Sequence, residues 1–172
     1  METLDVSCLG VHFALTEEDV SALRRLRDER ERLAFLQEQI EERYFAKPMI
    51  YAAESDKAWD AMHRALSDGL LTWDGGTYPL NHVVLAGELL YTQPDYIMSL
   101  KEPNKVRDIA VALEQVTESD LRARYKSIDA ESYGLPLSEE DFGYTWQWFQ
   151  NVRELYRRAA SEGRYVLFTA DQ

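Results

Sequence analysis

The sequence predicts a single α/β domain with three α/β/α layers around a central mixed sheet. Apolar segments typical of strands lie near both ends of the chain and in its middle, and helical patterns separate them. The 172 residues, 45% of them apolar, suffice for one packed core, so we interpret residues 1–172 as one domain. A long charged segment, residues 17–44, is expected to add an N-terminal helical excursion.

The first predicted strand runs from Asp5 to Leu15, where alternating and continuous apolar residues indicate a largely buried strand. Thr16 then resembles a helix N-cap, because three acidic residues follow it. From Glu17 to Tyr44 there is no Gly or Pro, and leucine and isoleucine recur at seven-residue spacing. This pattern predicts one amphipathic helix, or two that are separated near Asp28.

The middle of the chain alternates short elements. Pro48 ends the first helical segment, and residues 49–53 form a short extended segment. Ser55 or Asp56 is expected to cap a helix that carries Trp59 and His63 and stops at Gly69. Residues 71–79 form a turn or loop, whereas residues 82–90 fit a helical turn or a strand equally well.

The second half contains clearer signals. Residues 96–100 predict a strand, and Pro103 suits the first position of the helix that follows. Thr117 is expected to cap another short helix. Residues 127–142 form an irregular acidic loop, and residues 144–162 a helix that Gly163 closes. A buried strand over residues 165–169 completes the expected order.

Composition limits the possible partners. The net charge is -12, with 31 acidic and 19 basic residues, so nucleic acids and anionic membranes are disfavoured as partners. An acidic surface is typical of a soluble protein, and capture of a basic protein partner is the functional alternative. No apolar run approaches the roughly 20 residues that span a bilayer. The acidic N-terminus differs from a signal peptide, and the single Cys8 fits a reducing compartment. We therefore expect a cytoplasmic protein.

The strongest local candidate for chemistry is the helix around His63. Asp60 precedes His63 by three residues and could orient it as a general base, with Trp59 on the same helix face as His63. We nevertheless expect a structural role for His63, ordered by a hydrogen bond, and keep catalysis by His63 and Asp60 as the alternative. The three histidines have no metal-ligand spacing, and no phosphate-binding or nucleophile motif is present, so no metal or cofactor is predicted.

Four stretches together resemble the bacterial YfbM-like family. They are Asp56-Lys57-Ala58-Trp59-Asp60 with His63, then Gly87-Glu88, then residues 106–125, and finally residues 156–163 with the strand that follows. The resemblance covers most of the chain beyond about residue 50, and it implies a three-layer α/β/α fold and a cytoplasmic protein. The family brings no established catalytic residues, so none is carried over. The stretch Leu66-Ser67-Asp68-Gly69 departs from the family's usual Leu-Thr-Gly.

We interpret the chain as a non-enzymatic protein-binding module, with an immunity- or antitoxin-like protein as a specific version. The acidic surface, the missing catalytic motifs and the surplus of aromatic residues favour this reading. The alternative is a small hydrolase-type enzyme or a small-molecule sensor with a pocket around His63, Asp60 and Trp59. The residues expected to bind a ligand or partner are Trp59, His63, Asp56, Glu88 and Trp146.

Overall fold

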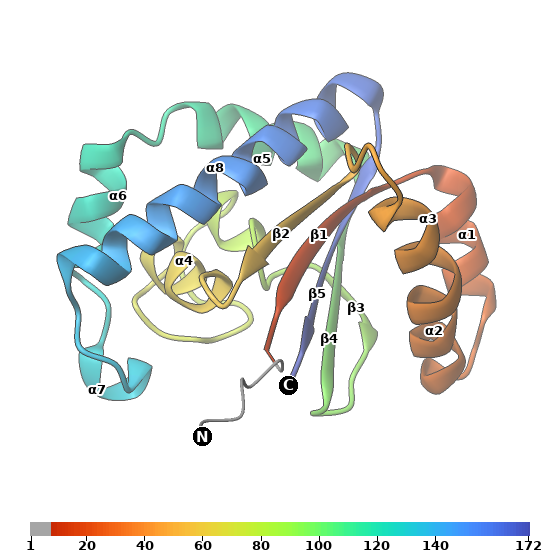
Figure 1. Cartoon of the computed structure of the whole chain (residues 1–172), viewed down its shortest axis with the longest axis horizontal. Coiled ribbons are helices and arrows are strands. Elements are labelled where there is room, and N and C mark those ends of the chain that lie inside the picture. Colours follow the sequence, from red (N-terminus) through yellow and green to blue (C-terminus); the bar gives the residue numbers. More distant parts are fainter. Residues whose placement is uncertain (1–7) are drawn as a thin grey trace.

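The computed structural model describes residues 8–172, which contain a five-stranded antiparallel sheet (Figure 1). The strand order is β2-β1-β5-β4-β3, so the first and last strands of the chain pair at the centre of the sheet. Both ends of the described chain therefore lie at one end of the sheet. The strands are β1 (Gly10–Leu15), β2 (Ala52–Asp56), β3 (Glu88–Tyr91), β4 (Tyr96–Lys101) and β5 (Tyr165–Asp171).

The α/β class predicted from the sequence is confirmed, but the predicted mixed sheet is wrong. All four strand pairs are antiparallel. Strand direction depends on how the connections return to the sheet, and apolar patterning within a strand does not reveal this. Residues 5–7 of the predicted first strand lie outside the described residues.

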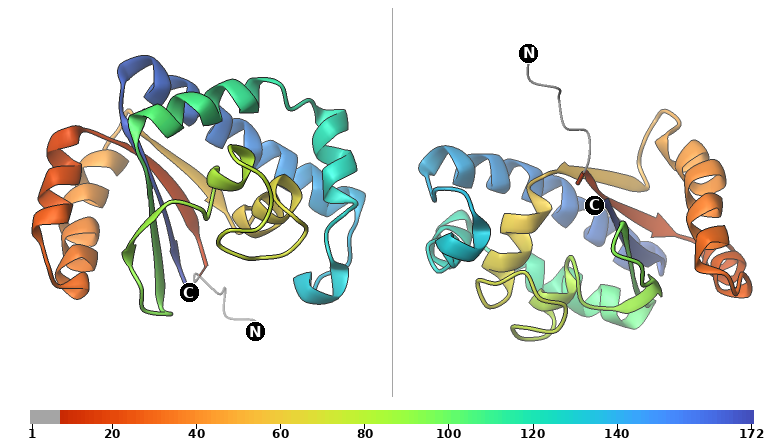
Figure 2. Two further views of the ribbon diagram at one scale, coloured as in Figure 1. Left: turned by 180° about the vertical axis from the view of Figure 1, so that it is seen from behind. Right: turned by 90° about the horizontal axis from the view of Figure 1, so that it is seen from below.

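One face of the sheet packs against the first group of helices, and Figure 2 shows this group from two further sides. Leu23, Leu36 and Ile40 are fully buried there against Phe13 and Leu167 of the sheet. The chain turns between the first two helices of this group, and the Asp28 side chain caps the second helix. The elements of this group are α1 (Glu17–Arg25), α2 (Glu29–Phe35), the π-helix η1 (Leu36–Ile40) and α3 (Glu41–Phe45).

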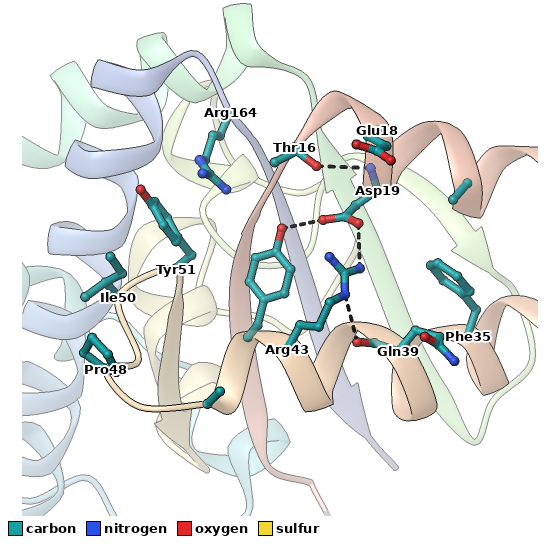
Figure 3. Close-up of a pocket in the computed structure, with 13 residues that line it drawn as sticks. Thr16, Glu18, Asp19, Phe35, Gln39, Arg43, Pro48, Ile50, Tyr51 and Arg164 are labelled. Atoms are coloured by element: carbon teal, nitrogen blue, oxygen red, sulfur yellow. Dashed lines mark hydrogen bonds and ion pairs between the residues drawn. The ribbon is translucent and has the colours of Figure 1, made fainter.

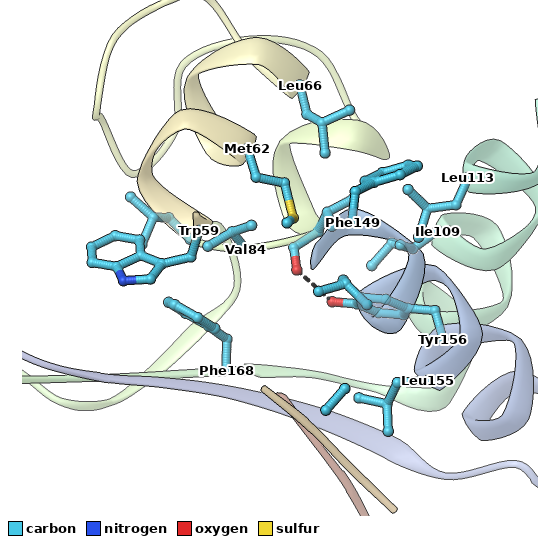
Figure 4. Close-up of a cluster of buried hydrophobic side chains, with 14 of the residues drawn as sticks. Trp59, Met62, Leu66, Val84, Ile109, Leu113, Phe149, Leu155, Tyr156 and Phe168 are labelled. Atoms are coloured by element: carbon cyan, nitrogen blue, oxygen red, sulfur yellow. Dashed lines mark hydrogen bonds between the residues drawn. The ribbon is translucent and has the colours of Figure 1, made fainter. Parts of the chain in front are cut away.

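The opposite face carries the larger apolar core, in which side chains of α4, α5 and α8 meet Phe168 of the sheet (Figure 4). None of the helices within residues 8–172 is long and apolar enough to cross a bilayer. The elements after β2 outside the sheet are α4 (Trp59–Leu66), the 3-10 turn η2 (Leu80–His82), α5 (Pro103–Glu114), α6 (Glu118–Tyr125), α7 (Ala130–Tyr133) and α8 (Glu139–Glu162).

Helix termini in this second half follow local sequence signals. Pro103 is the first residue of α5, and Thr117 forms a capping box with Asp120 at the start of α6. Gly163 ends α8 with a φ of 67°, a left-handed conformation that favours glycine. The predicted loop over residues 127–142 is only partly irregular, because it contains α7 and the first turn of α8.

The predicted cap of α4 is wrong. The N-cap position is Ala58, which offers no side-chain acceptor. Ser55 instead lies in β2 and donates a hydrogen bond from Oγ to the carbonyl of Gly10 at 3.3 Å. Asp56 ends the same strand with a φ of 49°. The contact between β2 and β1 thus uses the Ser55 side chain that the local sequence pattern assigned to the helix cap.

A buried polar cluster joins the sheet to the segment between η2 and β3. We use this name for His12, Ser99, Lys101 and Tyr156, whose side chains all bind backbone carbonyls of residues 82–85. His12 Nε2 and the Tyr156 hydroxyl donate to Val83 O at 2.7 and 2.8 Å. Lys101 Nζ donates to Val84 O, and Ser99 Oγ donates to Leu85 O at 2.6 Å.

The charge states within the cluster follow from burial. His12 and Lys101 are both fully buried. Desolvation, together with repulsion from Lys101, lowers the pKa of His12 to about 3. Burial also lowers the pKa of Lys101 well below its ordinary value. His12 is therefore neutral at pH 7 and keeps its proton on Nε2, because Val83 O can only accept.

We predict that His12 makes the folded protein lose stability in acid. In the unfolded chain the His12 side chain binds a proton near pH 6.5, whereas in the folded protein its pKa is about 3. The free energy of unfolding therefore falls as the pH drops below 6.5. His12 alone accounts for about 3 kcal/mol at pH 4. Urea unfolding of wild type and His12→Gln between pH 7 and 4 measures this difference. An unchanged pH dependence in the variant contradicts the assignment.

Candidate functional site

Trp59 is a packing residue on α4. Its side chain is 3% exposed and its ring lies against Phe168, with centroids 5.5 Å apart. The indole Nε1 donates to Cys8 O at 2.8 Å. A Cβ atom at Gly10 would come within 2.6 Å of the indole, so β1 needs glycine for this close approach. Only a small part of the Trp59 side chain is therefore accessible to the ligand or partner that the sequence analysis expected it to bind.

His63 lies fully buried under the loop that follows α4. Its Nε2 donates to Thr72 O at 2.7 Å, which is the ordering hydrogen bond that the sequence suggested. Nδ1 has no hydrogen-bond partner among the described residues. Burial lowers the pKa of His63 to about 4. The ring is therefore neutral at pH 7 but has no route to a substrate.

Asp60 does not orient His63. Its carboxylate accepts a hydrogen bond from Arg64 Nε at 2.6 Å, and the two residues form an ion pair across one turn of α4. The Arg64 side chain is only 5% exposed and also donates to Ser132 Oγ at 3.0 Å, which fastens α4 to α7. The catalytic pair of His63 and Asp60 considered from the sequence is not formed.

The remaining predicted binding residues belong to three different elements, and no two of them line the same cavity within residues 8–172. Asp56 ends β2 and lines a cavity at the end of the sheet. Glu88 lies on edge strand β3 and forms an ion pair with Arg24 of α1 at 2.7 Å. Trp146 packs on the core from α8, with its ring stacked on Phe149. The structure therefore does not bring the predicted set together into one site.

A cleft of about 510 Å³ lies between α1, α3 and the segment before β2 (Figure 3). Three of its four charged residues, Asp19, Arg43 and Arg164, already form ion pairs inside the protein. Asp19 accepts hydrogen bonds from Arg43 and from the Tyr44 hydroxyl, both at 2.6 Å. Burial acts to raise the pKa of Asp19, but these donors lower it overall. We interpret this network as a brace between α1 and α3, because it joins Asp19 of α1 to Arg43 and Tyr44 of α3.

A more open candidate is an apolar surface that we call the Trp73 surface. It comprises Leu71, Trp73, Leu85 and Leu89, which line two adjoining hollows of about 270 and 360 Å³. Trp73 is 43% exposed, and Leu71 and Leu89 are 36% and 37% exposed. Trp59 closes the floor of the larger hollow. The surface thus presents a half-exposed tryptophan surrounded by leucines.

The polar groups around the Trp73 surface are acidic or neutral. Asp74, Asn81 and His82 line the smaller hollow, and no Lys or Arg lines either hollow within the described chain. Asn81 Oδ1 lies 2.7 Å from His82 Nδ1 and holds that ring in place. Burial, with repulsion from Lys101 and Lys105, lowers the pKa of His82 to about 4, so His82 is neutral at pH 7.

Sequence reasoning missed Trp73 because it treated residues 71–79 only as a turn. A signal was present in Trp73-Asp74-Gly75-Gly76, where a large aromatic residue stands in a glycine turn that cannot easily bury it. The second missed group is the buried polar cluster, whose most distant members, His12 and Tyr156, are 144 residues apart in sequence.

Comparisons with known proteins identify the fold family but no activity. The family model described as a domain of unknown function (DUF1877) matches residues 6–169. Among solved structures, the chain is similar to YfbM from Escherichia coli, a protein of unknown function, with 20% identity and a TM-score of 0.67. That match covers 94% of this chain and 99% of the other. No curated protein matches the chain. Within residues 8–172, no cluster of His, Cys, Asp and Glu is arranged to hold a metal ion.

The two tryptophans that line the larger hollow should respond differently to truncation. Trp59→Ala removes a buried ring and should lower the free energy of unfolding by about 3–5 kcal/mol. Trp73→Ala removes a half-exposed ring and should cost about 1 kcal/mol or less. Urea denaturation of both variants tests the assignment. Equal losses would mean that Trp73 belongs to the core and not to a binding surface.

Proposed function

The chain belongs to the DUF1877 family, and we propose that it is a protein-binding module that docks a basic partner on the Trp73 surface. The exposed Trp73 carries this proposal. Tryptophan is the residue type most enriched among the anchors of protein interfaces, and monomeric proteins rarely leave one exposed among leucines. An immunity- or antitoxin-like inhibitor of a basic protein is the specific form that we favour.

Charge supports the choice of partner. The net charge of -12 produces a field that attracts basic proteins and repels acidic ones. Asp74 lines the smaller hollow, and the carboxylate of Asp68 lies close to the adjacent Gly75. A partner segment with an apolar anchor and flanking Lys or Arg residues fits this combination of an apolar centre and an acidic border.

The competing reading, a hydrolase or sensor with a pocket around His63 and Asp60, has less support. His63 is fully buried, and Asp60 is paired with Arg64. Of the three residues in that reading, only Trp59 reaches a hollow. We propose that these residues hold α4 in place beneath the Trp73 surface.

Selection from a random peptide display library tests the proposal without a known partner. The wild-type protein should enrich peptides that carry an aromatic or leucine anchor flanked by Lys or Arg. Trp73→Ala should weaken binding of those peptides about 30-fold or more, since truncation of an anchor residue costs at least about 2 kcal/mol. Added salt should also weaken binding, because charges are screened over about 10 Å at 0.1 M.

Val111→Ala provides the matched control. Val111 is 68% exposed on α5 and lines neither hollow, so this variant should bind the selected peptides as the wild type does. Selection of acidic peptides, or an equal loss in the Val111 and Trp73 variants, would count against a basic partner on this surface.

A further inference from the structure

Another cavity, which we call the acidic cavity, lies at the end of the sheet and is lined in part by residues of η1 and α3. Its volume is about 540 Å³. Aromatic rings from three different elements contribute to its wall. They are Phe45 from α3, Tyr96 from β4 and Trp148 from α8. The cavity shares only Tyr96 with the hollows of the Trp73 surface, so it is a separate feature of the fold.

All charged residues that line this cavity are acidic. Glu41, Glu54, Asp56 and Asp171 contribute carboxylates, and no Lys or Arg of the described chain is in the lining. None of these four carboxylates takes part in an ion pair among residues 8–172. Elsewhere many acidic side chains do pair with arginine, as Asp19 and Asp60 show. The cavity therefore concentrates negative charge that no ion pair within residues 8–172 neutralises.

Glu41 is the carboxylate of this cavity whose ionised form is penalised by burial. Its carboxyl is partly buried, and burial raises its pKa although the Tyr96 hydroxyl stabilises the charged form. A positive group that entered the cavity would remove this penalty. The faces of aromatic rings also attract cations independently of carboxylates, because the ring quadrupole places negative charge on each face. Rings and carboxylates therefore favour the same kind of ligand.

We propose that this cavity binds an organic cation, with an alkylguanidinium or alkylammonium head held between the aromatic wall and the carboxylates. The volume exceeds what a bare metal ion needs and accommodates a head group with part of its alkyl stem. A planar guanidinium suits aromatic walls especially well, because it stacks on rings and is weakly hydrated. This proposal does not depend on the Trp73 surface.

Titration with butylguanidinium and with its neutral isostere butylurea tests the proposal. The two probes share shape and apolar stem and differ in charge, so only butylguanidinium should shift the assigned indole NH signal of Trp148 in NMR spectra. Glu41→Gln and Asp171→Asn should each weaken this binding about tenfold. Asp171 is exposed at the end of β5, so Asp171→Asn keeps the test valid even if the Glu41 variant fails to fold.

Glu38→Gln is the matched control, because Glu38 is exposed on η1 and does not line the cavity. This substitution removes one negative charge, as each cavity variant does. It should leave the affinity for butylguanidinium unchanged. A second arm compares a short peptide that contains one arginine with the same peptide that contains citrulline. Tighter binding of the arginine peptide than of butylguanidinium identifies a protein side chain as the source of the cation, and equal binding identifies a free small cation.

Two results would overturn the proposal. One is equal binding of butylguanidinium and butylurea, which would show that charge does not matter in the cavity. The other is an equal loss of affinity in the Glu38 variant and the cavity variants, which would mean that only the overall charge of the protein attracts the probe. Failure of the peptide selection at the Trp73 surface leaves both of these readouts unaffected.

Discussion

The fold depends on how the segment of residues 82–85 is held over the sheet. This segment is neither helix nor strand after His82, so its carbonyls have no ladder to join, and a buried carbonyl without a partner costs about 1–3 kcal/mol. His12, Ser99, Lys101 and Tyr156 supply the missing donors from β1, β4 and α8. Three elements that are distant in sequence are thereby fixed around one short segment. Leu85, the last residue of this segment, lines both hollows of the Trp73 surface.

The same constraint explains why the histidines do not resemble catalytic bases. His12 and His63 both use Nε2 to donate to a backbone carbonyl, and in both Nδ1 has no partner among residues 8–172. A neutral buried ring suits this task, because protonation would place a charge next to apolar neighbours or Lys101. Their low pKa values therefore reflect desolvation in a structural role. The side chains that a ligand can reach are those of the Trp73 surface and of the acidic cavity.

Sequence reasoning succeeded where the signal was local and failed where residues compete across the fold. The capping box at Thr117, Pro103 at the start of α5 and Gly163 after α8 are each fixed by neighbours within a few positions. Ser55 could equally cap a helix or bind a strand, and only the position of β1 decides between these roles. Asp60 has His63 and Arg64 at comparable spacing, and arginine prevails because it offers a charged donor. Antiparallel pairing and the buried polar cluster are likewise properties of the assembled sheet.

Tyr96 connects the two proposed binding regions. It lies at the start of β4, lines the acidic cavity, and also lines the larger hollow of the Trp73 surface. Its ring is 8% exposed, so it separates the two regions as a shared wall. A basic partner segment that docks an apolar anchor against Trp73 therefore passes next to a cavity suited to a lysine or arginine side chain. Two weak contacts joined in one ligand bind more tightly than either alone, because the second contact forms at a high effective concentration. On this proposal, the four carboxylates of the acidic cavity, unpaired within residues 8–172, turn part of the overall negative charge into a local attraction for a cationic side chain.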